Sequence, residues 1–133
     1  MQHTNSLFFH YLLEYNTIFK ENDVIYRRMA AQFGLSDSAF WILYCLRESA
    51  TPLTQKQLCE SIYMSKQTIN SALRKLEQEG VLRLETIGGR KKQVFLTENG
   101  ERLVWQTAMQ VIEIENEIYK GWTEEEISSY LSL

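Results

Sequence analysis

Hydrophobic residues recur at helical spacing near the N-terminus and predict a long helix over residues 6–32. Leu7, Tyr11 and Ile18 fall on one side of that helix. A second helix, from Asp37 to about Ser49, is apolar nearly all round. An all-apolar helix in a small protein is expected to be central and buried.

The C-terminal part of the chain carries two further helical patterns. A long helix is expected from Glu98 to Lys120, capped by Thr97 and stopped by Gly121. Thr123 with Glu126 has the spacing of a capping box and opens a last helix. The helices at both ends are longer than the core of one compact domain requires. We therefore expect their apolar faces to contact a second copy of the chain.

Between these helices, the chain predicts two short helices joined by a tight turn. Thr54 and Gln57 have the capping-box spacing at the start of the first. Ser65 caps the second, which is expected over 66–79 because Gly80 tolerates the backbone conformation of a helix end.

A β-hairpin is expected after the second short helix. Val81–Glu85 and Val94–Leu96 are rich in branched apolar residues, and Gly88-Gly89 supplies the freedom of a tight turn. The connector 50–53 can add a short third strand beside the hairpin. The predicted tip is basic, with Arg90, Lys91 and Lys92.

The polar face of the second short helix carries amides, hydroxyls and cations, with no acid before Glu77. Such side chains contact base edges and phosphates in a major groove, although an ordinary solvated face is the alternative interpretation. A helix-turn-helix followed by a basic hairpin is the winged-helix arrangement. We predict base contacts from Ser65, Gln67, Thr68, Asn70 and Ser71. We predict phosphate contacts from Lys66, Arg74, Lys75 and Lys92, and contacts of the hairpin tip from Arg90 and Lys91.

Together these motifs resemble the MarR family of bacterial transcription regulators. The resemblance is carried by Pro52-Leu53-Thr54, Ser65-Lys66-Gln67-Thr68, Leu76-Glu77-x-x-Gly80, Arg90 and Leu96-Thr97-Glu98-Asn99-Gly100. It implies a DNA-binding homodimer, and one departure from the family pattern is Gly88, where the wing often has an Asp two residues before its Arg.

The expected fold is mainly α with a small β-hairpin wing, in a single domain over 1–133. A winged helix-turn-helix module over 36–97 lies between long N- and C-terminal dimerisation helices over 6–32 and 98–133. The expected function is sequence-specific binding of double-stranded DNA at a pseudo-palindromic operator, acting as a repressor. Half-sites about 10 base pairs apart follow from two-fold symmetry.

The charge distribution supports a single DNA-binding region. The chain has a formal net charge of -3, but residues 54–100 carry eight cations and five acids, whereas the remainder carries six cations and twelve acids. A basic module on an acidic scaffold is expected if only one face meets phosphate.

Other classes of protein are less compatible with the sequence. No nucleophile with its base, carboxylate pair or phosphate loop has a recognisable spacing, so we expect no enzyme and no cofactor. No histidine or cysteine pair is spaced to hold a metal on one helix. No apolar run is long enough for a membrane span and the N-terminus lacks signal-peptide features, which predicts a cytoplasmic protein. Cys45 and Cys59 lie in apolar helical patterns, as buried free thiols do.

A small-molecule effector is the remaining expectation from the resemblance. Members of the family often bind aromatic or amphipathic effectors between the dimerisation helices and the DNA-binding head. Here such a pocket would be lined by His10, Tyr11, Tyr15, Trp41 and Tyr44. Aromatic residues at helical spacing also occur as ordinary core. A winged-helix module for protein partners and a metal- or redox-responsive regulator remain the alternative functions.

Overall fold

The computed structural model describes the backbone of residues 2–133 and the side chains of residues 7–133. The chain divides into two compact units, residues 1–37 and 38–133, which are described separately. Across the residues described, no helix combines the length and the apolar character needed to cross a membrane.

The first unit is built on one long helix, α1 (Gln2–Gln32). It begins four residues before the predicted start at Ser6, and it ends where Gly34 takes a φ of +74°. Large apolar side chains are exposed along α1, at Leu7, Phe8, Phe9, Tyr11, Leu12, Leu13, Tyr15, Ile18, Phe19, Val24 and Ile25. An exposed apolar surface of this extent is typical of an interaction site.

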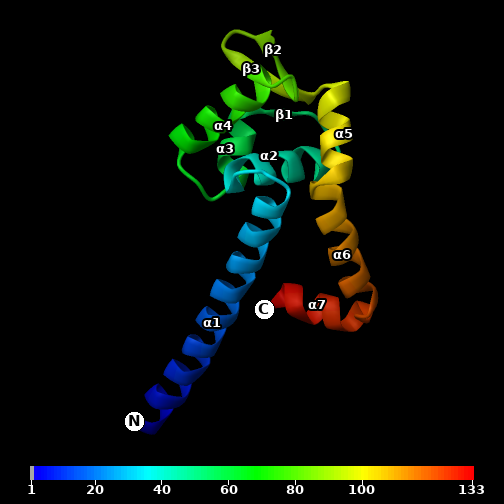
Figure 1. Cartoon of the computed structure of the whole chain (residues 1–133). Coiled ribbons are helices and arrows are strands. Elements are labelled where there is room, and N and C mark those ends of the chain that lie inside the picture. The colour runs from blue at the N-terminus through cyan, green and yellow to red at the C-terminus, as the bar shows by residue number, and fades with distance from the viewer. Residues whose placement is uncertain (1) are drawn as a thin grey trace. The chain divides into compact units, whose positions relative to one another are not determined.

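The second unit begins with α2 (Asp37–Glu48), α3 (Gln55–Ser61) and α4 (Lys66–Gln78) (Figure 1). The predicted central position of α2 is confirmed, because Phe40, Ile42 and Leu43 are fully buried. The core also takes in Leu58, Ile69, Leu73, Val94 and Val104, from both short helices, the sheet and a later helix.

A small antiparallel sheet follows α4, in the order β1-β3-β2. Its strands are β1 (Leu53–Thr54), β2 (Leu82–Gly88) and β3 (Lys91–Leu96). The predicted third strand is therefore present, since Leu53 pairs with Val94. We call residues 82–96 the wing.

The wing strands are longer than the apolar pattern indicated. Lys91 and Lys92 were expected at the tip, but they lie in β3 opposite Gly88 and Thr86, and only Gly89 and Arg90 form the turn. The pattern failed here because exposed strand residues need not be apolar.

The junction between the wing and α5 (Glu98–Gln106) is closely packed. The Thr97 hydroxyl donates to the Gly80 carbonyl at 2.6 Å and the Val81 carbonyl at 3.0 Å, and it accepts from the Gly100 N–H at 3.0 Å. A Cβ atom at Gly100 would lie 1.9 Å from the Val81 oxygen. The Leu96–Gly100 motif is thus explained by a backbone approach that only glycine permits.

The helix predicted as continuous from Glu98 to Lys120 is interrupted at Thr107, where φ is -128° and ψ is -89°. The Thr107 hydroxyl donates to the Leu103 carbonyl at 2.7 Å, a local bond that competes with helical geometry. The second part, α6 (Ala108–Lys120), buries Ala108, Val111 and Ile112. Its later apolar residues, Ile114, Ile118 and Tyr119, are exposed.

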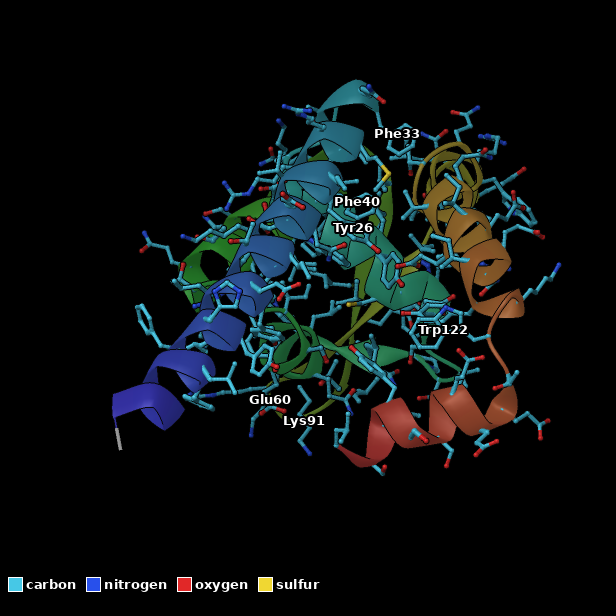
Figure 2. All side chains as sticks on the ribbon, turned by 90° about the horizontal axis from the view of Figure 1, so that it is seen from below. Tyr26, Phe33, Phe40, Glu60, Lys91 and Trp122 are labelled. Carbon is cyan, nitrogen blue, oxygen red and sulfur yellow. The ribbon has the colours of Figure 1, made fainter. Side chains whose placement is uncertain are left out.

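The last helix, α7 (Glu124–Ser132), starts with the predicted capping box of Thr123 and Glu126. The Thr123 N–H that donates to Glu126 holds the pKa of that carboxyl below its ordinary value. Figure 2 labels Trp122 beside the turn between α6 and α7. Its ring contacts those of Tyr119 and Tyr130, with centroid separations of 5.2 and 5.8 Å. This aromatic cluster adds to the exposed apolar surface at the C-terminal end.

Candidate nucleic-acid interface

Local capping interactions define the two short helices at the interface. Thr54 accepts from the Gln57 N–H at 3.1 Å, and its own N–H donates to the Gln57 side chain at 2.8 Å. Ser65 caps α4 by accepting from the Thr68 N–H at 3.1 Å. The predicted helix-turn-helix is therefore confirmed with its caps.

The two faces of α4 differ sharply in burial. Ile69, Ala72, Leu73 and Leu76 are buried on the inner face. The candidate contact residues on the helix itself are exposed, except that Asn70 is half-buried; they are Lys66, Gln67, Thr68, Asn70, Ser71, Arg74 and Lys75. Apart from Asn70, the structure thus places these candidates away from the core and open to a ligand.

The hydroxyl groups at the start of α4 have local partners. Ser65 Oγ and Thr68 Oγ1 lie 2.7 Å apart and share a hydrogen bond. For Gln67 and Ser71, the described residues supply no side-chain hydrogen bond, so their groups are open to a ligand. Base contact by any of these residues stays a prediction.

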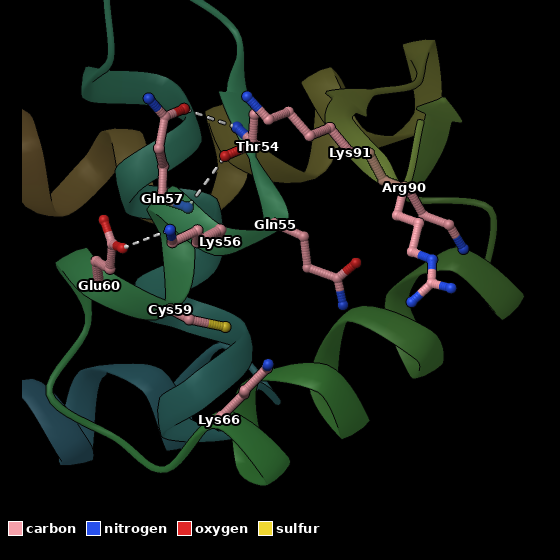
Figure 3. Close-up of a pocket in the computed structure, with 10 residues that line it drawn as sticks. Thr54, Gln55, Lys56, Gln57, Cys59, Glu60, Lys66, Arg90 and Lys91 are labelled. Atoms are coloured by element: carbon pink, nitrogen blue, oxygen red, sulfur yellow. Dashed lines mark hydrogen bonds and ion pairs between the residues drawn. The ribbon is translucent and has the colours of Figure 1, made fainter. Parts of the chain in front are cut away.

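A groove of about 900 Å³ runs between α3, the start of α4 and the wing (Figure 3). We call it the basic groove, because it is lined by the cations Lys56, Lys66, Arg90, Lys91 and Lys92. Its one lining acid is Glu60, which pairs with Lys56 at 3.9 Å. The fold therefore brings the wing candidates and Lys66 to one surface that suits a polyanion.

Of the residues that line the basic groove, Gln55 and Lys56 are two that the sequence did not identify as site residues. Gln55 and Lys56 lie in the first turn of α3 and line the groove opposite the wing. The sequence does show an amide and a cation directly after the Thr54 cap. It could not show that these residues lie near the wing, because their proximity depends on the tertiary fold.

Not every cation of the wing is available for a ligand. Arg83 stacks over the Phe95 ring, with its guanidinium carbon 4.7 Å from the centroid, and it also pairs with Glu85. Arg83 therefore stabilises the wing itself.

Gln55 also connects the two helices of the motif. Its Nε2 donates to Asn70 Oδ1 at 2.8 Å, and Cys59 Sγ lies 3.9 Å from the same oxygen. Figure 3 shows the Gln55 side chain extending from the start of α3. The side chain of Asn70, a predicted base-contacting residue, is thus held mainly by Gln55 of α3.

The cysteines and the potential metal ligands bear on the alternative of a metal- or redox-responsive regulator. Cys45 and Cys59 are free and half-buried, and burial raises the pKa of the Cys45 thiol. A raised pKa lowers the thiolate fraction on which redox sensing depends. Within residues 7–133, no cluster of three or more His, Cys, Asp or Glu side chains could hold a metal ion.

The candidate effector residues are distributed over both units. His10, Tyr11 and Tyr15 are exposed on α1 in the first unit. In the second unit, Trp41 and Tyr44 pack together with centroids 5.1 Å apart, and the Tyr44 hydroxyl donates to Glu115 at 2.6 Å. An effector pocket formed by these residues stays a prediction.

The sequence is similar to known regulators. The model of the MarR family matches residues 33–93. The HTH-type transcriptional regulator YwoH of Bacillus subtilis is 28% identical over 102 residues, which cover 76% of this chain and 74% of that protein. The HTH-type transcriptional regulator PecS of Dickeya dadantii is 30% identical over 103 residues, which cover 74% of this chain and 62% of PecS.

The fold is similar to solved structures of regulators. NMB1585, a MarR family regulator from Neisseria meningitidis, has a TM-score of 0.77 at 20% identity, with 91% of this chain and 86% of that chain covered. MepR of Staphylococcus aureus in complex with DNA has a TM-score of 0.66 at 22% identity, covering 92% and 90%. Bordetella bronchiseptica BpsR, whose DNA binding is regulated by 6-hydroxynicotinic acid, has a TM-score of 0.64 at 16% identity, covering 90% and 94%.

Proposed function

The chain belongs to the MarR family of DNA-binding transcription regulators, and we propose that it acts as a homodimeric repressor on a pseudo-palindromic operator. The observation that carries this proposal is the exposed polar face of α4 beside the basic groove. A helix of this kind enters the major groove, while cations on the wing contact the flanking backbone or minor groove.

Each side-chain class has a separate role in this proposal. The amides and hydroxyls of α4 contact base edges and supply sequence preference. The cations supply affinity by neutralising phosphates, and this contribution weakens as salt rises. We extend the phosphate-contacting set to Lys56, because it lines the basic groove with Lys66 and the wing cations.

The homodimer is supported by apolar surface that the single chain leaves exposed. Leu7, Phe19 and Ile25 on α1 are each more than half exposed, as are Ile118 and Leu131 at the C-terminal end. Burying such side chains stabilises association by about 25 cal/mol per Å² of apolar area. Two copies related by a two-fold axis would place two α4 helices about 10 base pairs apart on DNA.

Release by a small molecule is the regulatory part of the proposal. BpsR provides the precedent, since 6-hydroxynicotinic acid regulates its DNA binding. In this chain, His10, Tyr11, Tyr15, Trp41 and Tyr44 offer aromatic surface for a planar or amphipathic effector. A repressor of this kind would act in the cytoplasm, where its operator is found.

The test is selection from a pool of random duplex DNA at two salt concentrations, followed by sequencing of the retained fragments. An inverted repeat with half-sites about 10 base pairs apart, and affinity that falls steeply with salt, is the expected result. An affinity that hardly responds to salt, with no sequence enriched, would instead indicate a winged helix that binds protein partners.

Gln67→Ala and Arg90→Ala are expected to change different properties of DNA binding, sequence preference in the first and overall affinity in the second. Loss of the Gln67 amide should relax preference at one base position, at a cost of about 1 to 3 kcal/mol. Loss of the Arg90 charge should weaken binding to all sequences and reduce the salt dependence. Titration of selected and mismatched duplexes at several salt concentrations separates the two effects, and equal behaviour of both variants would refute the division of roles.

A further inference from the structure

We propose that Gln55 determines the base preference of Asn70 by fixing the orientation of its amide. In this proposal, which rests on the proposed DNA-binding function, Gln55 is a positioning residue and need not contact DNA. It holds Asn70 Oδ1 toward α3, so that Asn70 presents hydrogen-bond donors and no acceptor to the DNA.

The Asn70 oxygen has one close hydrogen-bond donor and one weak one, both on α3. An amide oxygen has two lone pairs, and here Gln55 Nε2 lies 2.8 Å and Cys59 Sγ 3.9 Å from it. Both partners belong to α3, whereas Asn70 belongs to α4. The two N–H bonds of Asn70 Nδ2 are then the hydrogen-bonding capacity left for a ligand.

The two N–H groups of the Asn70 amide lie near the proposed DNA surface. Asn70 is half-buried and borders a hollow of about 310 Å³, together with Gln55, Arg74 and Lys92. Arg74 comes from α4 and Lys92 from the wing, and both are proposed phosphate contacts. Glu77, Leu73 and Leu84 line the same hollow, and a base edge that enters it would meet the Asn70 amide.

An asparagine restricted to donors has a different base preference from a free one. A free asparagine pairs with adenine through two hydrogen bonds, accepting from N6 and donating to N7. With Oδ1 occupied, Asn70 can only donate, which favours guanine O6 and N7 or thymine O4. Cytosine is the least suitable base, because its N4 group is itself a donor.

Gln55→Glu is the decisive substitution, because it preserves shape and reverses hydrogen-bonding polarity. A glutamate at 55 can only accept, so Asn70 must turn its Nδ2 toward α3 and its Oδ1 toward the DNA. Base preference at the Asn70 position should then change from guanine or thymine to cytosine or adenine. Gln55→Ala should leave the amide free to rotate and shift the preference at that position toward adenine by roughly three- to tenfold.

The experiment is random-duplex selection with the full-length chain and with Gln55→Glu, Gln55→Ala and Asn70→Ala. Asn70→Ala identifies the base position concerned, because discrimination there should be lost. Gln93→Ala is the matched control, since Gln93 is another half-buried glutamine, and within the described residues its side chain has no hydrogen bond. Thermal unfolding of each variant confirms that it is folded.

The outcomes separate this inference from the proposed function. The proposal is overturned if the wild-type chain selects an inverted repeat but Gln55→Glu leaves its base preferences unchanged, or if Asn70→Ala alters no position. Selection of no sequence by the wild-type chain would overturn the proposed function and this inference together. A changed preference in the Gln55 variants at the position that Asn70→Ala identifies, absent from Gln93→Ala, supports it.

Discussion

Gly100→Ala is expected to lower the free energy of unfolding by about 3 kcal/mol or more. The added Cβ would lie 1.9 Å from the Val81 carbonyl oxygen and 3.1 Å from a Leu96 methyl group. Backbone cannot move aside as a flexible side chain can, and the same Val81 oxygen accepts hydrogen bonds from the N–H and the hydroxyl of Thr97. Relief of the clash would therefore separate α5 from the wing. Urea denaturation followed by circular dichroism measures the effect.

Gly121→Ala is the matched control for this prediction. A Cβ at Gly121 would meet the Ile118 oxygen at an ordinary 3.5 Å, and the backbone there has a φ of -77° that alanine readily adopts. We expect a change within about 1 kcal/mol, in the stabilising direction. Equal stability of the two variants would contradict the close approach at Gly100.

Replacing Arg90, Lys91 and Lys92 together by alanine is expected to weaken DNA binding by roughly three orders of magnitude near physiological salt. In the proposed homodimer the change removes the three cations from both wings. Each phosphate contact contributes about 0.9 to the slope of log K against log salt, so the slope should become less steep by about five. Fluorescence anisotropy with the selected operator at several salt concentrations measures both quantities.

A double substitution away from the basic groove controls for the loss of charge alone. Arg102 pairs with Glu98 within α5, and Lys120 pairs with Glu117 within α6. Arg102→Ala with Lys120→Ala should leave the salt slope nearly unchanged. If the control reduces the slope as much as the wing substitution does, the wing cations are not the phosphate contacts.

The helix-turn-helix could be predicted closely because its signals are local. The capping box of Thr54 and the Ser65 cap each operate over three residues, and the buried face of α4 follows from helical spacing. Gly80 ends the helix region with a φ of +75°, as its position indicated. Sequence spacing and structure agree here because neighbouring residues determine both.

Features that depend on distant parts of the chain could not be predicted in this way. The bond between Gln55 and Asn70 joins residues 15 positions apart, and it forms only once α3 and α4 are packed. The interruption at Thr107 was missed because a threonine is compatible with a continuous helix until its hydroxyl bonds the preceding turn. The start of α1 lacked an apolar pattern before residue 6, which left its first turn undetected.

The close approach at Gly100 and the hydrogen bonds of Thr97 join α5 to the base of the wing. The wing extends away from α5. Its strand β2 has seven residues, and at about 3.3 Å per residue the tip of the wing lies roughly 20 Å from its base. A rotation of α5 by about 5° would therefore displace Arg90 by about 2 Å, which exceeds the tolerance of a hydrogen bond to DNA. Movements of α5 that carry the base of the wing with them would therefore be larger at the wing tip than at α5 itself.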